Sequence, residues 1–293
     1  MTVLLFGHRG ARGLYPENTL EGFAGTIALG VDGIELDVGM TADGIAVVSH
    51  DPAVNPDIAR GPDGRWIDAP GPLIRSLSLA ELQRFDVGRA RPGGAVAAAN
   101  PVQQPRDGAR IPTLADALRT IPATALIELK TLADRPQLTA TPEAMVHAMF
   151  DAIDQAEAGG RIIVESFDWR GPRLVRRLRS SLPVAWLTRA ETVRNARLWW
   201  AGPHPGDFGG SVPRAVAAEA AGSTWAPEHI DLTEDAVQEA HALGLRVIPW
   251  TVNDPARMRT LIAWDVDGFI TDRPDLGRVA IRLQSPEVAS PEA

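Results

Sequence analysis

The sequence predicts an α/β fold, a (β/α)₈ TIM barrel with an insertion after a hairpin on the second strand. Short apolar runs rich in valine, isoleucine and leucine alternate with helical segments along the 293-residue chain. Eight strand-like runs can be counted, and eight is the strand number of such a barrel. Polar and charged residues recur at the C-terminal ends of these runs, where a barrel builds its active site.

The predicted strands are apolar along most of their length, as expected for parallel strands that are buried on both faces. They span residues 3–8, 33–38, 125–130, 161–167, 184–188, 223–227, 246–252 and 268–271. A further return strand, ending at His50, pairs with the second of them. This count leaves the return strand outside the barrel.

Five segments between the strands show helical patterns, at residues 19–29, 142–158, 172–182, 233–243 and 255–264. Residues that favour helix N-caps precede or open three of these segments, namely Asn18, Thr233 and Asp254. Glycines that favour helix ends lie at the close of three of them, namely Gly30, Gly159 and Gly244. Strand and helix therefore alternate as a barrel requires.

We predict a single domain over residues 1–283, because α/β barrels of this length commonly form one domain. Residues 51–110 interrupt the alternation, since they are rich in proline, glycine and aspartate and show one clear short helix, at 78–85. An irregular segment of this length is usually a lid or a binding insertion. The polar residues 284–293 are predicted to be a disordered tail.

The composition excludes several classes of function. A net charge of −8 without a basic stripe makes a nucleic-acid partner unexpected. The absence of cysteine excludes disulfides, thiolate catalysis and cysteine-bound zinc.

No apolar run approaches the ~18 residues of a transmembrane helix. Met1 leads directly into a strand, without a signal-like segment, so we expect a cytoplasmic protein. The oligomeric state is not predicted.

The second strand carries two carboxylates on one face, because Glu35 and Asp37 are two residues apart. Asp43 and Gly44 are predicted to form a two-residue hairpin turn after this strand. Counting outward from that turn places Asp37 opposite His50, close enough to share a ligand. The alternative is that Asp37 and His50 form an ordinary ion pair.

Three carboxylates at the ends of neighbouring strands favour a hard divalent cation. Glu35, Asp37 and Glu128 are the predicted ligands, and Mg²⁺ or Ca²⁺ is the expected ion. Zinc, held through His8 or His50, is the second choice.

Cations and imidazoles complete the predicted site. Arg9 and Lys130 suit an anionic substrate, although both could also simply neutralise the carboxylates. His8 and His50 can divide general acid and base roles, because imidazole titrates near neutral pH. Such a pair suits cleavage of a phosphodiester, whose leaving alkoxide must be protonated. For two further strand-end residues, Glu165 and Asn253, a structural and a functional role are equally plausible.

The order of motifs along the chain closely resembles the glycerophosphodiester phosphodiesterase family. The motifs are His8-Arg9-Gly10, Pro16-Glu17-Asn18-Thr19, Gly33-Ile34-Glu35-Leu36-Asp37-Val38, Thr41-Ala42-Asp43-Gly44, His50-Asp51, Glu128-Leu129-Lys130, Ser166-Phe167-Asp168, Trp250-Thr251-Val252-Asn253 and the run from Asp267 to Pro274. The resemblance covers residues 3 to 280 and implies a barrel that hydrolyses glycerophosphodiesters to sn-glycerol 3-phosphate and an alcohol, with a divalent cation.

Carried over position by position, the resemblance implies roles for individual residues. Glu35, Asp37 and Glu128 would be metal ligands, and His8 and His50 the acid/base pair. Arg9 and Lys130 would hold the phosphate, and Trp250 would pack against the glycerol. The partner is then a small-molecule glycerophosphodiester.

Two other functions remain open from the sequence. A lysophospholipase D or sphingomyelinase D activity would need an apolar, membrane-facing surface on the insertion. Trp66, Leu73, Ile74 and Leu77 are the candidates for it. The non-enzymatic alternative is a barrel that binds a metal and phosphoesters without turnover.

Overall fold

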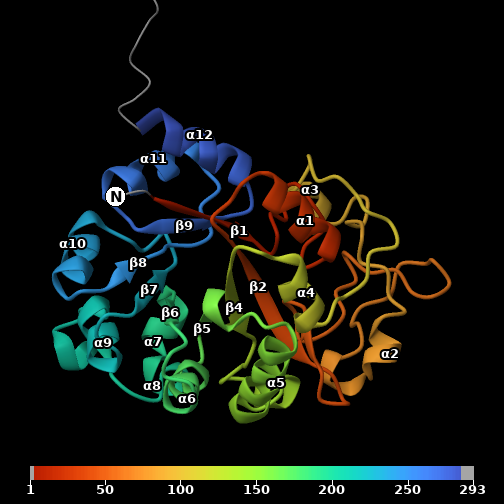
Figure 1. Cartoon of the computed structure of the whole chain (residues 1–293), viewed down its shortest axis with the longest axis horizontal. Helices are drawn as coiled ribbons and strands as arrows, with labels where there is room; N and C mark the ends of the chain where they lie inside the picture. Colours follow the sequence, from red (N-terminus) through yellow and green to blue (C-terminus); the bar gives the residue numbers. More distant parts are fainter. Residues whose placement is uncertain (1–2, 285–293) are drawn as a thin grey trace, which may run out of the picture.

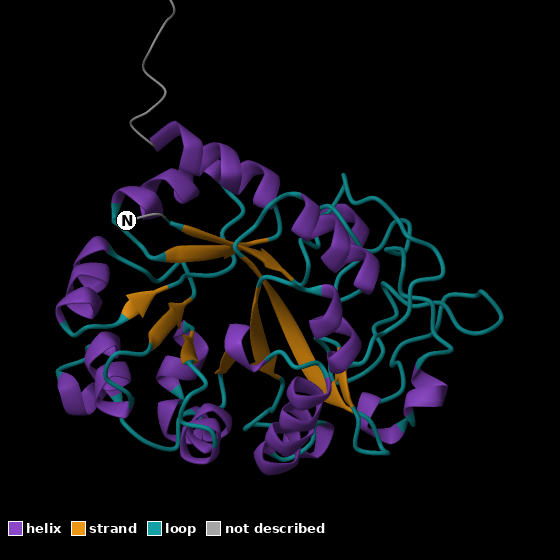
Figure 2. Ribbon diagram, viewed as in Figure 1, coloured by secondary structure: helices purple, strands orange, loops and turns teal. Residues whose placement is uncertain are grey.

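The computed structural model describes residues 3–284. Eight parallel strands form a barrel and helices surround it, as Figures 1 and 2 show. The strands are β1 (Leu4–His8), β2 (Gly33–Met40), β4 (Thr124–Leu129), β5 (Ile162–Ser166), β6 (Val184–Thr188), β7 (Thr224–Pro227), β8 (Arg246–Val247) and β9 (Gly268–Thr271). Their order around the sheet is β8-β7-β6-β5-β4-β2-β1-β9, and β3 (Ala46–Val48) pairs antiparallel with β2. The predicted fold class is confirmed.

The barrel is closed by backbone hydrogen bonds that join residues 247–252, which begin at the end of β8, to residues 267–270 at β9. Val247 O accepts from Asp267 N at 3.0 Å, Pro249 O from Ile270 N at 2.9 Å, and Ile270 O from Val252 N at 2.9 Å. The strand predicted at 246–252 ends as a regular strand at Val247. Pro249 explains the difference, because proline has no N–H to contribute to a sheet ladder.

Two apolar layers hold the barrel together. Residues that point inward fill its interior, among them Phe6, Leu126, Ile163 and Ile248. A larger cluster lies between the strands and the surrounding helices. It includes Trp200, which is fully buried and stacks on Trp169 with ring centroids 4.1 Å apart. The interior cluster fills the barrel, so a ligand can bind only above these side chains, at the C-terminal ends of the strands.

The described helices confirm the predicted alternation and add elements to it. The longer ones are α1 (Leu20–Ala28), α4 (Leu114–Thr120), α5 (Pro142–Gln155), α6 (Arg170–Leu178), α9 (Val212–Glu219), α10 (Glu234–Ala242), α11 (Pro255–Ala263) and α12 (Pro274–Gln284). Short ones are α2 (Leu79–Leu82), α3 (Ala95–Ala99), α7 (Ala190–Arg194), α8 (Ala196–Trp199) and the 3₁₀ turns Ile74–Ser76, Pro136–Leu138, Gly159–Arg161 and Pro205–Phe208. None of the helices described could span a membrane.

Two of the predicted helix signals were wrong. Thr19, not Asn18, caps α1, because its side chain accepts a hydrogen bond from Gly22 N. This leaves the Asn18 amide free for another contact. Gly159 begins a 3₁₀ turn instead of ending α5, and the left-handed residue after α5 is Glu157, with φ 52°. Thr233 and Asp254 cap α10 and α11 as predicted.

The hairpin after β2 has a three-residue loop, so the predicted register was wrong by one residue. Val38 lies opposite Val48, and Thr41 N donates to Ile45 O at 3.0 Å. Gly44 takes a left-handed conformation, with φ 81°, as the last loop residue. In this register Asp37 O accepts from Ser49 N at 2.9 Å. Ser49, and not His50 as predicted, therefore lies opposite Asp37.

The insertion at residues 51–110 forms a lobe beside the barrel, seen as the loop-rich side of Figures 1 and 2. It has a small core of its own, which includes Val54, Ala59, Ile74, Leu82 and Val87. Two of the four residues considered for a membrane-facing surface belong to this lobe core. Ile74 is buried within it, and Leu77 packs against it. These two side chains therefore point inward.

The C-terminal boundary of the predicted domain needs a correction of one residue. Gln284 belongs to α12, whose last turn it completes, and is not part of a tail. The rest of the predicted tail lies outside the described residues.

Candidate active site

The predicted site residues lie at the C-terminal ends of β1, β2 and β4. Parallel pairing places His8 beside Glu35 and Asp37 beside Glu128. Glu128 in turn lies beside Glu165 of β5. Because neighbouring parallel strands in register bring these residues to one level of the barrel, their side chains meet at its open end.

One cavity of about 490 Å³ collects most of these side chains. Seven of the eight predicted site residues line it, namely His8, Arg9, Glu35, His50, Glu128, Lys130 and Trp250. The eighth, Asp37, is fully buried and lies in ion-pair contact with two cavity residues, Arg9 and Lys130. The structure therefore brings together residues that span 243 positions of the sequence, from 8 to 250.

The three predicted metal ligands converge on one point. Oxygen atoms of Glu35, Asp37 and Glu128 lie within 4.8 Å of one another, and all three residues are buried. Within residues 3–284, Asp37 Oδ1 has no hydrogen-bond partner. Convergent carboxylate oxygens of this kind suit a hard divalent cation, so the residues present fit the predicted ion.

A side-chain amide and two cations stabilise the Asp37 carboxylate. Asn18 Nδ2 donates to Oδ2 at 2.9 Å, Arg9 Nε lies 3.4 Å from the same oxygen, and Lys130 Nζ lies 3.3 Å from Oδ1. Burial opposes ionisation of Asp37, but nearby cationic groups, led by Lys130, outweigh it and hold the pKa well below its ordinary value. Asp37 is therefore the firmly charged member of the group.

Glu35 has the opposite tendency. Burial, followed by repulsion from the neighbouring carboxylates, raises the pKa of Glu35 well above its ordinary value. Its Oε2 accepts a hydrogen bond from Arg9 N at 3.0 Å and lies 3.8 Å from His8 Nε2. Carboxylates whose pKa values are pushed apart at one site are typical of functional centres.

His8 is held by a residue that the sequence analysis did not identify as part of the site. His8 Nδ1 lies 2.5 Å from Asp272 Oδ1, which also accepts from Arg12 Nε at 2.9 Å. Asn253 Nδ2 donates to Asp272 Oδ2 at 2.7 Å, so Asn253 orients this carboxylate. Burial lowers the pKa of His8. The sequence held one sign of this role, because Asp272 places a carboxylate directly after the last strand, β9.

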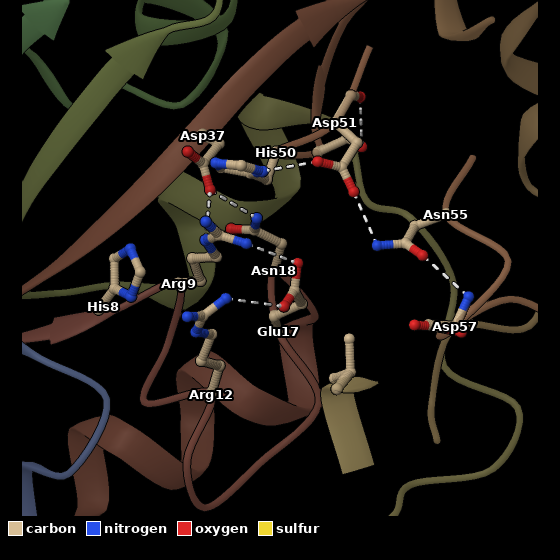
Figure 3. A network of polar contacts seen from close by, with 12 residues as sticks. His8, Arg9, Arg12, Glu17, Asn18, Asp37, His50, Asp51, Asn55 and Asp57 are labelled. Atoms are coloured by element: carbon tan, nitrogen blue, oxygen red, sulfur yellow. Dashed lines mark hydrogen bonds and ion pairs between the residues drawn. The ribbon is translucent and has the colours of Figure 1, made fainter. Parts of the chain in front are cut away.

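His50 opens a polar chain that runs into the insertion, drawn in Figure 3. His50 Nδ1 lies 2.8 Å from Asp51 Oδ1, and Asn55 Nδ2 donates to Asp51 Oδ2 at 2.7 Å. Asn55 Oδ1 then accepts from Asp57 N at 2.8 Å. The first residues of the insertion thus fix the orientation of the second histidine.

The two predicted phosphate-binding cations are tied to the carboxylates. Arg9 follows β1 in a left-handed turn, and it and its next two neighbours have φ values of 50°, 72° and 57°. Its guanidinium donates to Glu17 Oε1 at 3.1 Å. Lys130 Nζ donates to Glu128 Oε1 at 2.8 Å. Both cations line the cavity, so they neutralise carboxylates and still border the open space.

Part of the cavity wall is apolar. Trp250 donates through Nε1 to Ala226 O at 2.9 Å, and its ring meets Phe167 edge to face with centroids 5.3 Å apart. Arg189 lies 5.1 Å above the Phe167 ring. This wall can accept the carbon skeleton of a small ligand.

Comparison with known proteins places the chain among phosphodiesterases. The model of the glycerophosphoryl diester phosphodiesterase family matches residues 8–276. A glycerophosphodiester phosphodiesterase of Caldanaerobacter subterraneus is 26% identical over 276 residues, which cover 94% of this chain and 96% of that protein.

Solved structures agree with this comparison. A protein from Silicibacter pomeroyi, provisionally named a glycerophosphoryl diester phosphodiesterase, has a TM-score of 0.87 and 33% identity, covering 96% of this chain and 93% of its own. An Oleispira antarctica phosphodiesterase in complex with the product sn-glycerol-3-phosphate has a TM-score of 0.70 and 21% identity. The match covers 95% of this chain and 96% of that protein. The latter shares the fold.

Proposed function

The chain belongs to the glycerophosphoryl diester phosphodiesterase family, and from this premise we propose that it hydrolyses glycerophosphodiesters to sn-glycerol 3-phosphate and an alcohol. One observation carries the proposal: the cavity beside the three carboxylates is also lined by two histidines, by Lys130 and by four arginines, Arg9 among them. An anion of phosphodiester size, a cation and two proton-transfer groups can therefore meet there. We propose that the domain predicted from the sequence, extended by one residue to Gln284 and including the insertion at 51–110, acts as one catalytic unit.

Glu35, Asp37 and Glu128 would hold a divalent cation, Mg²⁺ or Ca²⁺. When bound, the ion would polarise a phosphoryl oxygen and offset its charge. Asp37 would offer this ion a full negative charge, because Lys130 and its other cationic neighbours hold its pKa below the ordinary value. Arg9 contributes through its backbone N–H, which fixes the orientation of the Glu35 carboxylate.

Arg9 and Lys130 would bind the phosphate. The guanidinium of Arg9 is planar and can donate two parallel hydrogen bonds to phosphate oxygens, while Lys130 offers a compact charge. Glu17 and Glu128 hold these two groups at the cavity before a ligand arrives. Little conformational entropy is then lost on binding, because the side chains are already ordered.

His8 and His50 would divide the proton transfers, one accepting a proton from the attacking oxygen and the other protonating the leaving alkoxide. Each imidazole uses Nδ1 for a carboxylate, Asp272 or Asp51. This leaves Nε2 of each ring available for the reacting atoms. A positioned imidazole of this kind typically contributes ~10² to 10⁴-fold in rate.

Trp250 and Phe167 would contact the glycerol end of the substrate through their ring faces and edges. The alcohol end would face the rim, where the insertion supplies Asp51 and Pro52 to the cavity. We therefore propose that the insertion influences which alcohol is released.

The test is a hydrolysis assay on glycerophosphoethanolamine, glycerophosphocholine and glycerophosphoglycerol, with Mg²⁺, with Ca²⁺ and after EDTA treatment. We expect sn-glycerol 3-phosphate to be released from at least one substrate, and only with a cation. Failure to hydrolyse any of the three with either cation would contradict the proposal. A lysophospholipid arm, in which release of a lysophosphatidic acid is measured, separates the lysophospholipase D alternative.

A further inference from the structure

A fourth carboxyl group at the same level of the barrel has no role in the mechanism above. Glu165 lies on β5 directly beside Glu128, which lies beside Asp37 on β2. It is 1% exposed, but it belongs to the cavity lining. Its carboxyl group therefore borders the space where a ligand binds.

Glu165 has no partner among residues 3–284. Its Oε2 is buried without a hydrogen bond, and the nearby Lys130 forms its ion pairs with Asp37 and Glu128 instead. A glutamate at a strand end often pairs with a neighbouring arginine, but no arginine pairs with Glu165 in the described part of the chain. Leaving a buried polar group unsatisfied costs about 1–3 kcal/mol, so such a group typically marks a place where a ligand atom completes the hydrogen bonding.

The surroundings of Glu165 indicate which part of a ligand it meets. Phe167, Leu187, Trp250 and Ile270 line the same cavity and present apolar surface to it. Glu165 is thus a polar group set in an apolar wall, next to the carboxylates of the proposed cation site. A ligand hydroxyl one or two carbons away from the phosphate would lie there, whereas a second phosphate would be repelled by the carboxylates.

We propose that Glu165 is a specificity-determining residue that hydrogen-bonds a hydroxyl of the substrate's glycerol unit. The inference rests on the proposed function, because it assumes that a glycerophosphodiester occupies the cavity. It goes further, because it names one side chain that makes the site prefer a glycerol phosphate to an alkyl phosphate without hydroxyls. A site built to bind a hydroxyl disfavours an analogue that lacks it, because the buried polar group is then left unpaired.

The test compares the affinities of the cation-loaded protein for sn-glycerol 3-phosphate and n-propyl phosphate by calorimetry. These two ligands share the phosphate and the three-carbon chain and differ in the hydroxyls. For Glu165→Met, we expect the ratio of the two affinities to fall by about tenfold or more, mainly because sn-glycerol 3-phosphate binds less tightly. Glu165→Gln, which retains hydrogen-bonding atoms, should keep most of the ratio.

A stability measurement separates this role from a structural one. If Glu165 serves a ligand and not the fold, Glu165→Met should melt at the same temperature as the wild type or higher, since an unpaired buried carboxyl is removed. Ile163→Val, two residues earlier on β5 and inside the barrel core, is the matched control. It should lower the melting temperature and leave the affinity ratio unchanged.

The outcomes are distinguishable. A wild-type ratio that persists within twofold in Glu165→Met overturns this inference and leaves the proposed function intact. A wild type that binds neither phosphate and hydrolyses no glycerophosphodiester overturns the proposed function, and this inference with it. If Glu165→Met did not fold, the ligand-serving role would be contradicted by that result itself, because the carboxyl would then be needed by the fold.

Discussion

The histidines and the cations of the site each have a fixed partner that determines what they can do. His8 and His50 both pair through Nδ1 with a carboxylate, while Lys130 and Arg9 lie against Asp37. Because these partners come from different strands and loops, each role can be tested by a single substitution that leaves the others in place.

Removing the second imidazole should stop turnover without unfolding the protein. We predict that His50→Ala lowers kcat by ~10² to 10⁴-fold on a glycerophosphodiester, because one proton transfer loses its catalyst. His147→Ala, at an exposed position of α5, is the control and should retain full activity. Steady-state kinetics and circular dichroism of both variants provide the measurement. Near wild-type kcat in His50→Ala would show that the acid/base assignment is wrong.

Asp272 is predicted to position His8. In Asp272→Asn an amide replaces the carboxylate that accepts from Nδ1, so the ring loses its preferred orientation and tautomer. We expect kcat to fall by roughly 10 to 100-fold with little change in KM, as for other groups that orient a functional side chain. Cation affinity, measured in parallel, should stay constant. A variant with altered cation affinity and unchanged kcat would contradict a positioning role.

The site residues were predictable because each one ends an apolar strand, whereas their partners were not. Glu35, Asp37 and Glu128 stand out as charges in buried runs. The pairing of His8 with Asp272 joins positions 264 residues apart, and nothing in the local pattern of either reveals it. Glu165 was equally ambiguous, since only the structure shows that no arginine pairs with it within residues 3–284.

Among the elements, most strands follow the sequence pattern closely, whereas β8 and the turns do not. The strands at Val184–Thr188 and Gly268–Thr271 have the predicted bounds. The hairpin after β2 was misregistered, because Asp43 and Gly44 are compatible with both two-residue and three-residue loops. The helices of the insertion are too short for a helical period to be visible, as at Ala95–Ala99.

The insertion depends on charged contacts that should weaken in acid. Hydrogen bonding from Arg89, together with Arg60, lowers the pKa of Asp107 to about 2. Its folded-state pKa is depressed, so its stabilising effect is present above the ordinary value near 3.8 and is lost as the pH falls through about 2. Hydrogen exchange of the insertion, corrected for intrinsic rates, should therefore increase over this range.

The Asp107→Asn variant provides the comparison for that effect. At pH 5 we expect faster exchange around residues 86–109 in the variant than in the wild type, and the difference should shrink toward pH 2. Asp63→Asn is a suitable control, because the Asp63 carboxylate is exposed and lies 3.8 Å from its nearest cation. A difference between the two proteins that is independent of pH would contradict the assignment.

At the scale of the whole molecule, the barrel places groups from distant parts of the chain at one end. The alternation of strands and helices was sufficient to predict this architecture, because parallel strands joined by helices close in few ways. It was not sufficient to predict how the last strands meet, since closure near Pro249 depends on individual backbone hydrogen bonds. The insertion is an addition to this frame, and it reaches the site through His50 and Asp51.

The central claim is that the carboxylates of three strands bind one divalent cation. Calorimetric titration of chelator-treated protein with Mg²⁺ and with Ca²⁺ tests it most directly. We predict one site per chain for at least one of these ions, and affinity lowered by ~100-fold or more in Glu128→Gln, because a charged ligand of a three-carboxylate set is lost. Absence of binding, or equal affinity in the wild type and Glu128→Gln, would contradict the account.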